Sequence, residues 1–185
     1  MLQSKNKIGS KTYFEEEGSS KGHRMIAGVD EAGRGPLAGP VVAAACILPA
    51  GMVFEGIDDS KVLTPSKRDY LFKMITENKD ILYGVGVVDN NLIDELNILQ
   101  ASLHAMNLAI QNLAKQPDYL LVDGTHLPPT HIASKAVVKG DSRSQTIGAA
   151  SIIAKFTRDN MMKKFHDDWP MYGFDQNKGY GTKKH

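Results

Sequence analysis

The feature that most constrains this chain is an apolar stretch, residues 26–29, that runs directly into two neighbouring carboxylates, Asp30 and Glu31. Burying an unpaired carboxylate carries a large free-energy cost or forces the group to take up a proton. An apolar strand that ends in two acids therefore needs something for those acids to bind. A glycine-rich turn that holds one arginine, residues 33–35, follows at once.

Apolar periodicity divides the rest of the chain into alternating strands and helices. Thr64 followed by Pro65 is typical of a helix start, since threonine caps the first turn and proline suits the first helical position. Strands are expected over residues 25–30, 41–48, 81–88, 119–122 and 136–138, and helices from 65, from about 90, over 99–113 and over 142–166. This alternation predicts an α/β fold in which part of the sheet is parallel.

The length of 185 residues suits a single domain with a sizeable core. Residues 1–23 are rich in Lys, Ser, Gly and Glu and are expected to form a flexible tail with a short helical turn at 13–17, so that 24–185 form the domain. Cys46 is the single cysteine, which excludes a disulfide within the chain and fits a reducing compartment. The apolar runs are too short to cross a bilayer, so a cytoplasmic protein is expected.

Charge is unevenly distributed along the chain. Residues 1–134 carry a net charge of −4 and residues 135–185 a net charge of +5. The basic end could form an electrostatic surface for a polyanion, or simply a solvated helix face.

Three predicted strands end in carboxylates: Asp30 with Glu31, then Asp123, then Asp141. If these strands are neighbours, their ends converge at one edge of the sheet, where sites of α/β proteins usually lie. Acids gathered there would repel and raise one another's pKa unless a cation binds. An all-oxygen ligand set favours a hard divalent ion, Mg²⁺ or Mn²⁺, and two such ions form a common phosphodiester-cleaving site.

Each acid also has a simpler explanation. Asp123 with Gly124 could form only a turn, Asp141 could cap the following helix, and Glu31 could form a surface ion pair with Arg34. The joint occurrence favours a common site. Adjacent strand residues point to opposite faces, so Asp30 and Glu31 can share a site only if the regular strand stops at this pair.

The turn at residues 33–35 is ambiguous as well. Its glycines permit close approach of the backbone to a ligand, or a positive φ. The pattern fits a dinucleotide-binding fingerprint loosely, but Pro40 and the apolar run after it leave no room for the helix that such a motif needs. A Walker loop is excluded, because no Gly-Lys-Ser/Thr follows.

The stretch from Asp30 to Val41 resembles the opening motif of ribonuclease HII, the type 2 ribonucleases H. Later blocks resemble that family in the same order, at residues 59–61, 97–102, 122–124, 139–155 with 158–159, and 177–182. The similarity covers about residues 25–185. Members of the family usually continue with a further helix and a basic tail, which would add to nucleic-acid affinity.

The resemblance implies a ribonuclease H-like fold, with a central mixed β-sheet flanked by helices. It implies an endonuclease that hydrolyses the RNA strand of RNA–DNA hybrids and incises 5′ to ribonucleotides embedded in duplex DNA. It assigns metal binding to four acids: Asp30, Glu31, Asp123 and Asp141. It assigns substrate contacts to a turn that senses the ribose 2′-hydroxyl, to a stacking tyrosine and to a serine–lysine pair near the phosphate: Gly33, Arg34, Gly35, Tyr180, Ser60 and Lys61.

Two-ion hydrolysis would leave 3′-hydroxyl and 5′-phosphate ends without a histidine base. A monomer is expected, and the basic end supplies candidate phosphate contacts. These are Lys139, Arg143, Lys155, Arg158, Lys163 and Lys164. Two alternatives use the same fold: a junction-resolving nuclease without a 2′-hydroxyl sensor, and a nucleic-acid-binding protein without catalysis.

Overall fold

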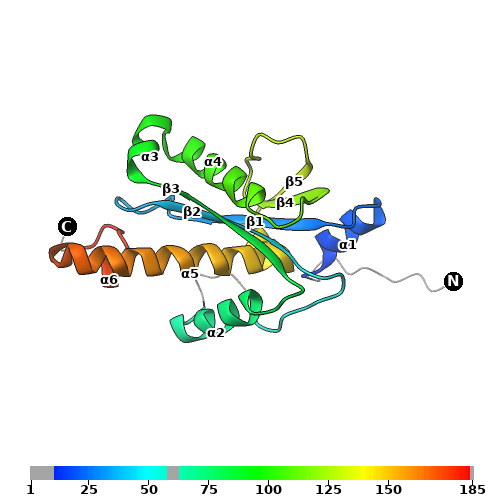
Figure 1. Cartoon of the computed structure of the whole chain (residues 1–185), viewed down its shortest axis with the longest axis horizontal. Coiled ribbons are helices and arrows are strands. Elements are labelled where there is room, and N and C mark those ends of the chain that lie inside the picture. Colours follow the sequence, from blue (N-terminus) through cyan, green and yellow to red (C-terminus); the bar gives the residue numbers. More distant parts are fainter. Residues whose placement is uncertain (1–10, 58–62, 184–185) are drawn as a thin grey trace.

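A computed structural model describes residues 11–57 and 63–183 of the chain. Its centre is a five-stranded sheet with the strand order β3-β2-β1-β4-β5 (Figure 1). The strands are β1 (Ile26–Ala32), β2 (Val41–Ile47), β3 (Leu82–Val88), β4 (Tyr119–Asp123) and β5 (Ala133–Val137). β2 runs antiparallel to both β1 and β3, whereas β4 runs parallel to both β1 and β5. The predicted α/β fold with a mixed sheet is therefore confirmed.

Helices cover both faces of the sheet (Figure 1). The helices are α1 (Tyr13–Ser20), α2 (Pro65–Thr76), α3 (Asn90–Leu96), α4 (Ile98–Gln111), α5 (Gln145–Asp168) and α6 (Phe174–Asn177), with 3₁₀ turns η1 (Gly140–Ser142) and η2 (Pro170–Tyr172). α4 packs on one face, and α5 and α2 pack on the other. Among the described residues, no helix combines the length and the apolar character that crossing a bilayer requires.

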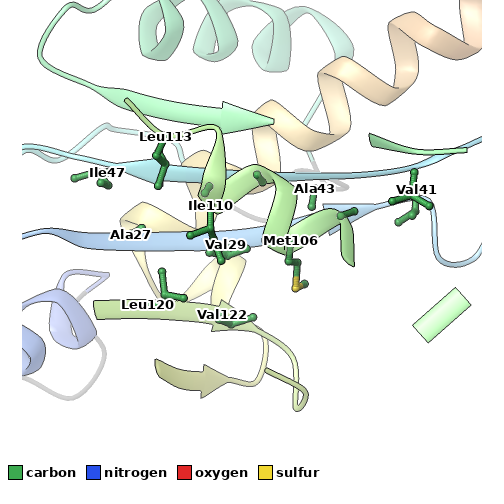
Figure 2. Packing of buried hydrophobic residues seen from close by; sticks show 14 of the residues in the cluster. Ala27, Val29, Val41, Ala43, Ile47, Met106, Ile110, Leu113, Leu120 and Val122 are labelled. Atoms are coloured by element: carbon green, nitrogen blue, oxygen red, sulfur yellow. The ribbon is translucent and has the colours of Figure 1, made fainter. Parts of the chain in front are cut away.

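The inner strands β1, β2 and β4 are buried on both faces over most of their length, which is why β2 is apolar at every position. On the α4 face, Val29 of β1 and Leu120 of β4 pack with Met106 and Ile110 (Figure 2). On the α5 face a helix also lies very close to the sheet. A Cβ added to Gly28 of β1 would lie 2.1 Å from the carbonyl carbon of Thr146, so only glycine lets α5 lie this close to the central strand.

The beginning of α5 differs from its prediction. The helix starts at Gln145 rather than at 142, and the Ser144 hydroxyl caps it by accepting the Ile147 N–H at 3.2 Å. Asp141 therefore lies in the η1 turn before the helix and is not its N-cap. The strand expected over 136–138 is β5, which begins three residues earlier and ends one residue earlier, at Val137.

The N-terminal segment differs as well. The flexible tail was expected over residues 1–23, of which 1–10 lie outside the described residues. From residue 11 the chain is ordered against the domain, and α1 is longer than the expected turn at 13–17. The reason is burial: the Phe14 side chain is 7% exposed and packs in a small core with Ile26 and Tyr119.

Candidate active site

Asp30 and Asp123 occupy equivalent positions on two neighbouring parallel strands. The last paired residues of β1 and β4 are Val29 and Val122, and each acid comes next in its own strand. β1 itself does not stop there, because it continues through Glu31 to Ala32 in register with β2. The condition for Asp30 and Glu31 to share a site, that the regular strand stops at this pair, is therefore not met on the β2 side. Only the pairing with β4 ends, after Val29.

The carboxylate of Asp30 is almost enclosed, with 5% of the residue exposed. Burial, followed by the charges of Glu31 and Asp123, holds the pKa of Asp30 well above its ordinary value. Hydrogen bonds from the Ser151 hydroxyl and from the Glu31 N–H, at 2.7 Å, act in the opposite direction. Negative charge is thus concentrated where the protein supplies too few positive or donor groups to balance it.

Asp123 is tied to the turn that carries Asp141. Its Oδ1 accepts the Gly140 N–H at 2.6 Å, and Gly140 begins η1. Asp141 follows, is 7% exposed and accepts the N–H of Ser142 at 2.9 Å. Asp123 is therefore more than a turn residue, because its side chain fixes the start of the next turn. The four acids come from β1, the end of β4 and the turn after β5.

These acids fit a divalent cation by their chemistry. Carboxylate oxygens are the ligands that Mg²⁺ and Mn²⁺ prefer, and the raised pKa of Asp30 marks negative charge that a cation would neutralise. Within residues 11–57 and 63–183, however, no three His, Cys, Asp or Glu side chains lie close enough to hold one ion together. The carboxylates would have to turn toward an ion in order to share it.

A hollow of about 240 Å³ opens beside Glu31. Six of the predicted substrate contacts are in its wall, which consists of Glu31, Ala32, Gly33, Arg34, Gly35, Ser151, Lys155, Arg158 and Tyr180. The glycine turn at residues 33–35, which forms part of this wall, needs glycine for its backbone shape. Gly33 has a φ of +112°, and a Cβ there would lie 2.5 Å from the Pro40 carbonyl oxygen. Tyr180 is 44% exposed. The fold thus brings the glycine turn and the distant tyrosine to one hollow.

Arg158 lines the hollow, yet its guanidinium is bonded to the protein's own backbone. The residue is 1% exposed, and burial lowers the pKa of its guanidinium. Its Nε, Nη1 and Nη2 donate to the carbonyl oxygens of Pro40, Lys178 and Ala38 at 2.9, 2.9 and 3.0 Å. These donors are bonded to the protein's own backbone, and a contact between Arg158 and substrate stays a prediction. Arg158 fastens residues 38 and 40, which follow the glycine turn, to the segment that carries Tyr180.

The remaining predicted contacts have different surroundings. Lys155 lines the hollow and forms an ion pair with Asp159 at 2.6 Å. Arg34 forms a 3.2 Å ion pair with Glu31, as one interpretation of the sequence allowed. Arg143 donates to the Val138 carbonyl oxygen and lies over the Phe14 ring. Ser60 and Lys61 lie outside the described residues.

Ser151 is the site residue that the sequence did not identify. It donates to Asp30 and lines the hollow, so it belongs to both parts of the site. One signal could have found it. Ser151, Lys155 and Arg158 are separated by four and three residues, which puts them on one face of a helix.

Comparisons with known proteins agree with this architecture. A solved ribonuclease H2 from Pyrococcus horikoshii superposes with a TM-score of 0.71 at 29% identity, over 85% of this chain and 81% of that one. The ribonuclease HII family model matches residues 27–185. The ribonuclease HII of Chlamydia caviae is 56% identical over 176 residues, which are 95% of this chain and 82% of the relative. That of Geobacter sulfurreducens is 54% identical over 172 residues, 93% of this chain and 79% of the relative.

The fold is thus the ribonuclease H-like fold, with its acids grouped at one end of a mixed sheet. The chain belongs to the ribonuclease HII family and is a ribonuclease H, an endonuclease.

Proposed function

We propose that this chain hydrolyses the RNA strand of RNA–DNA hybrids and incises duplex DNA 5′ to single embedded ribonucleotides. The products are 3′-hydroxyl and 5′-phosphate ends. One observation carries the proposal: the acids adjoin a hollow walled by a glycine turn and a tyrosine. Glu31 is one of the acids, Ser151 donates a hydrogen bond to Asp30, and both residues line the hollow. A group that cuts and a group that distinguishes ribose from deoxyribose then act on the same nucleotide.

Divalent metal would be held by Asp30, Glu31, Asp123 and Asp141, as Mg²⁺ or Mn²⁺, with two ions during catalysis. Bound there, the ions would supply polarisation of the scissile phosphate and a water of lowered pKa. The protein's own part is orientation. The Glu31 N–H and the Ser151 hydroxyl hold the Asp30 carboxylate, and the Gly140 N–H holds that of Asp123.

Ribose recognition is assigned to Gly33, Arg34 and Gly35. A 2′-hydroxyl both donates and accepts hydrogen bonds, so backbone N–H and C=O groups without intervening side chains can read it. A Cβ on Gly35 would be 3.4 Å from Cε1 of Tyr180, so the two lie at contact distance across the hollow. Tyr180 is exposed enough to stack on a nucleotide, an interaction worth about 1–3 kcal/mol.

Phosphate contacts are assigned to Lys155, which lines the hollow, and to Ser60 and Lys61 on the resemblance alone. Arg143 stays a weaker candidate, since its guanidinium already has a carbonyl and a ring as partners. A monomer in the cytoplasm is the expected form.

The test is cleavage of a duplex that carries one ribonucleotide, compared in Mg²⁺, Mn²⁺ and EDTA. We expect incision with either ion and none in EDTA, and loss of incision in Asp30→Asn and Asp123→Asn. Gly35→Ala should fold normally, since its Cβ meets only an ordinary contact, yet cleave the ribonucleotide substrate poorly.

Two outcomes contradict the proposal. Equal cleavage of an all-DNA duplex would favour a junction-resolving nuclease. Binding that ignores Mg²⁺, with no product from any hybrid, would favour a binding protein without catalysis.

A further inference from the structure

The N-terminal helix α1 supplies hydrogen-bond partners to the beginning of α5. α1 precedes residue 27, so it lies outside the part of the chain that the family model matches. A helix leaves its first four N–H groups without partners inside the helix. In α5 these are the N–H groups of residues 144–147: Ile147 donates to the Ser144 hydroxyl, as expected of an N-cap residue, and Ser144 donates to the Gly140 carbonyl oxygen at 2.8 Å. The other two, Gln145 and Thr146, donate to the segment that contains α1.

That segment provides two acceptors. The Gln145 N–H donates to the Lys11 carbonyl oxygen at 2.9 Å, and the Thr146 N–H donates to Oε1 of Glu15 at 2.9 Å. The same Oε1 accepts the hydroxyls of Ser144 at 2.7 Å and Thr146 at 2.9 Å. Glu15 therefore adds a negative charge to the positive end of the α5 dipole and also fixes the hydroxyl that caps the helix.

We call residues 139–144 the Asp141 turn. α1 also contacts the chain before this turn, at Lys135, and within it, at Arg143. Lys135 of β5 and Arg143 at the end of η1 each lie over the Phe14 ring, with Nζ and Cζ 5.0 Å from its centroid. Lys135 also forms an ion pair with Glu17 of α1. The turn that carries Asp141 is thus fixed before it through Phe14 and after it through Glu15.

We propose that α1 is a positioning element of the active site, in which Glu15 is the positioning residue that orders the Asp141 turn for metal binding. This rests on the proposed function in one respect, the role of Asp141 as a metal ligand. Glu15 does not line the substrate hollow, and its hydrogen bonds go to Ser144 and Thr146, so it acts through residues 139–147. Loss of Glu15 should therefore affect metal binding and kcat while leaving KM for a hybrid unchanged.

The surroundings of Glu15 separate positioning from stability. Glu15 lines a second hollow, of about 550 Å³, whose wall also includes Met52 and Thr146. In Glu15→Ala, water entering this hollow can satisfy the exposed donors. Water cannot hold the two segments together, so the turn loses order with little change in overall stability. Glu15→Gln keeps an oxygen at the acceptor position and should restore the order.

The experiment uses the full chain and begins without metal. Hydrogen exchange in EDTA should be about tenfold faster for the amides of residues 140–147 in Glu15→Ala, and unchanged in β1 and β2. Calorimetric titration with Mn²⁺ should give about tenfold weaker binding, the order of loss seen when partners of metal ligands are removed. Glu15→Gln should stay within about twofold of the wild type in both measurements. Glu16→Ala is the matched control, since the Glu16 carboxylate accepts the Thr12 hydroxyl of its own helix.

Three outcomes are decisive. Unchanged exchange and unchanged Mn²⁺ affinity in Glu15→Ala would overturn the proposal, as would faster exchange spread evenly over the whole sheet. Asp141→Asn tests separately whether Asp141 is a metal ligand. If Asp141→Asn kept wild-type Mn²⁺ affinity and cleavage, the role of Asp141 would fail, and the exchange result would still decide whether α1 orders the turn.

Discussion

Replacing Arg158 by methionine tests whether this residue is a structural tie or a phosphate contact. Methionine keeps the length of the aliphatic stem and removes every donor. Hydrogen bonds from a charged group contribute about 1.5–3 kcal/mol each, and Arg158 donates three to carbonyl oxygens. Removing the buried charge recovers part of its desolvation cost, so the three contributions do not add in full. We expect the free energy of unfolding to fall by about 3–4 kcal/mol.

Urea unfolding followed by the fluorescence of Trp169, the single tryptophan, measures this change. In a chain of this size the melting temperature should fall by about 2–4 °C for each kcal/mol. Arg34→Met is the matched control, because Arg34 is exposed and its ion pair with Glu31 should contribute at most about 1 kcal/mol. A similar small loss in Arg158→Met would refute the reasoning.

The salt dependence of hybrid binding gives an independent check. A residue that neutralises one phosphate steepens the slope of log affinity against log salt concentration by about 0.7–0.9. Arg158→Met should leave that slope unchanged while it weakens discrimination between ribose and deoxyribose, since the tie joins the segment directly after the glycine turn, at Ala38, to the Tyr180 segment. A slope that falls by this amount, with stability intact, would make Arg158 a phosphate contact after all.

Three further predictions concern buried positions. Because the pKa of Asp30 is raised, the folded state binds the carboxyl proton more tightly than the unfolded state does. Protonation of Asp30 therefore stabilises the fold fully below the ordinary pKa of 3.8, and this stabilisation is lost as the pH rises through the raised pKa. In EDTA, Asp30→Asn should therefore melt above the wild type at about pH 8 and equal to it near pH 4; the reverse order would refute the electrostatic argument. Gly28→Ala should destabilise the fold by about 3 kcal/mol or more in urea unfolding, because its Cβ would overlap the α5 backbone at Thr146, and a loss of about 1 kcal/mol or less would contradict this packing. Burial raises the pKa of the Cys46 thiol, so a thiol reagent should label Cys46 only after unfolding in urea; rapid labelling of the native chain would contradict its enclosure.

Local sequence determined the elements and much of the chemistry. The alternation of apolar segments predicted each of the sheet strands to within a few residues, because a strand buried on both faces has to be apolar throughout. The acids at strand ends predicted a shared location from the same logic, since parallel strands end at one edge of a sheet. The glycine turn predicted a close backbone approach, and Gly33 does have a positive φ.

Tertiary structure decided what each polar side chain does, because a side chain's partner is set by distance and not by sequence position. Arg158 looked like a phosphate contact beside other basic residues, yet it donates to the backbone carbonyls of Pro40 and Lys178. Glu15 looked like part of a flexible tail, yet packing of Phe14 brings it to the beginning of α5. Asp30 and Glu31 stay within a regular strand, because β1 continues in register with β2 after its pairing with β4 has ended. Local patterns fix periodicity and charge, whereas only the packed chain fixes which donors and acceptors meet.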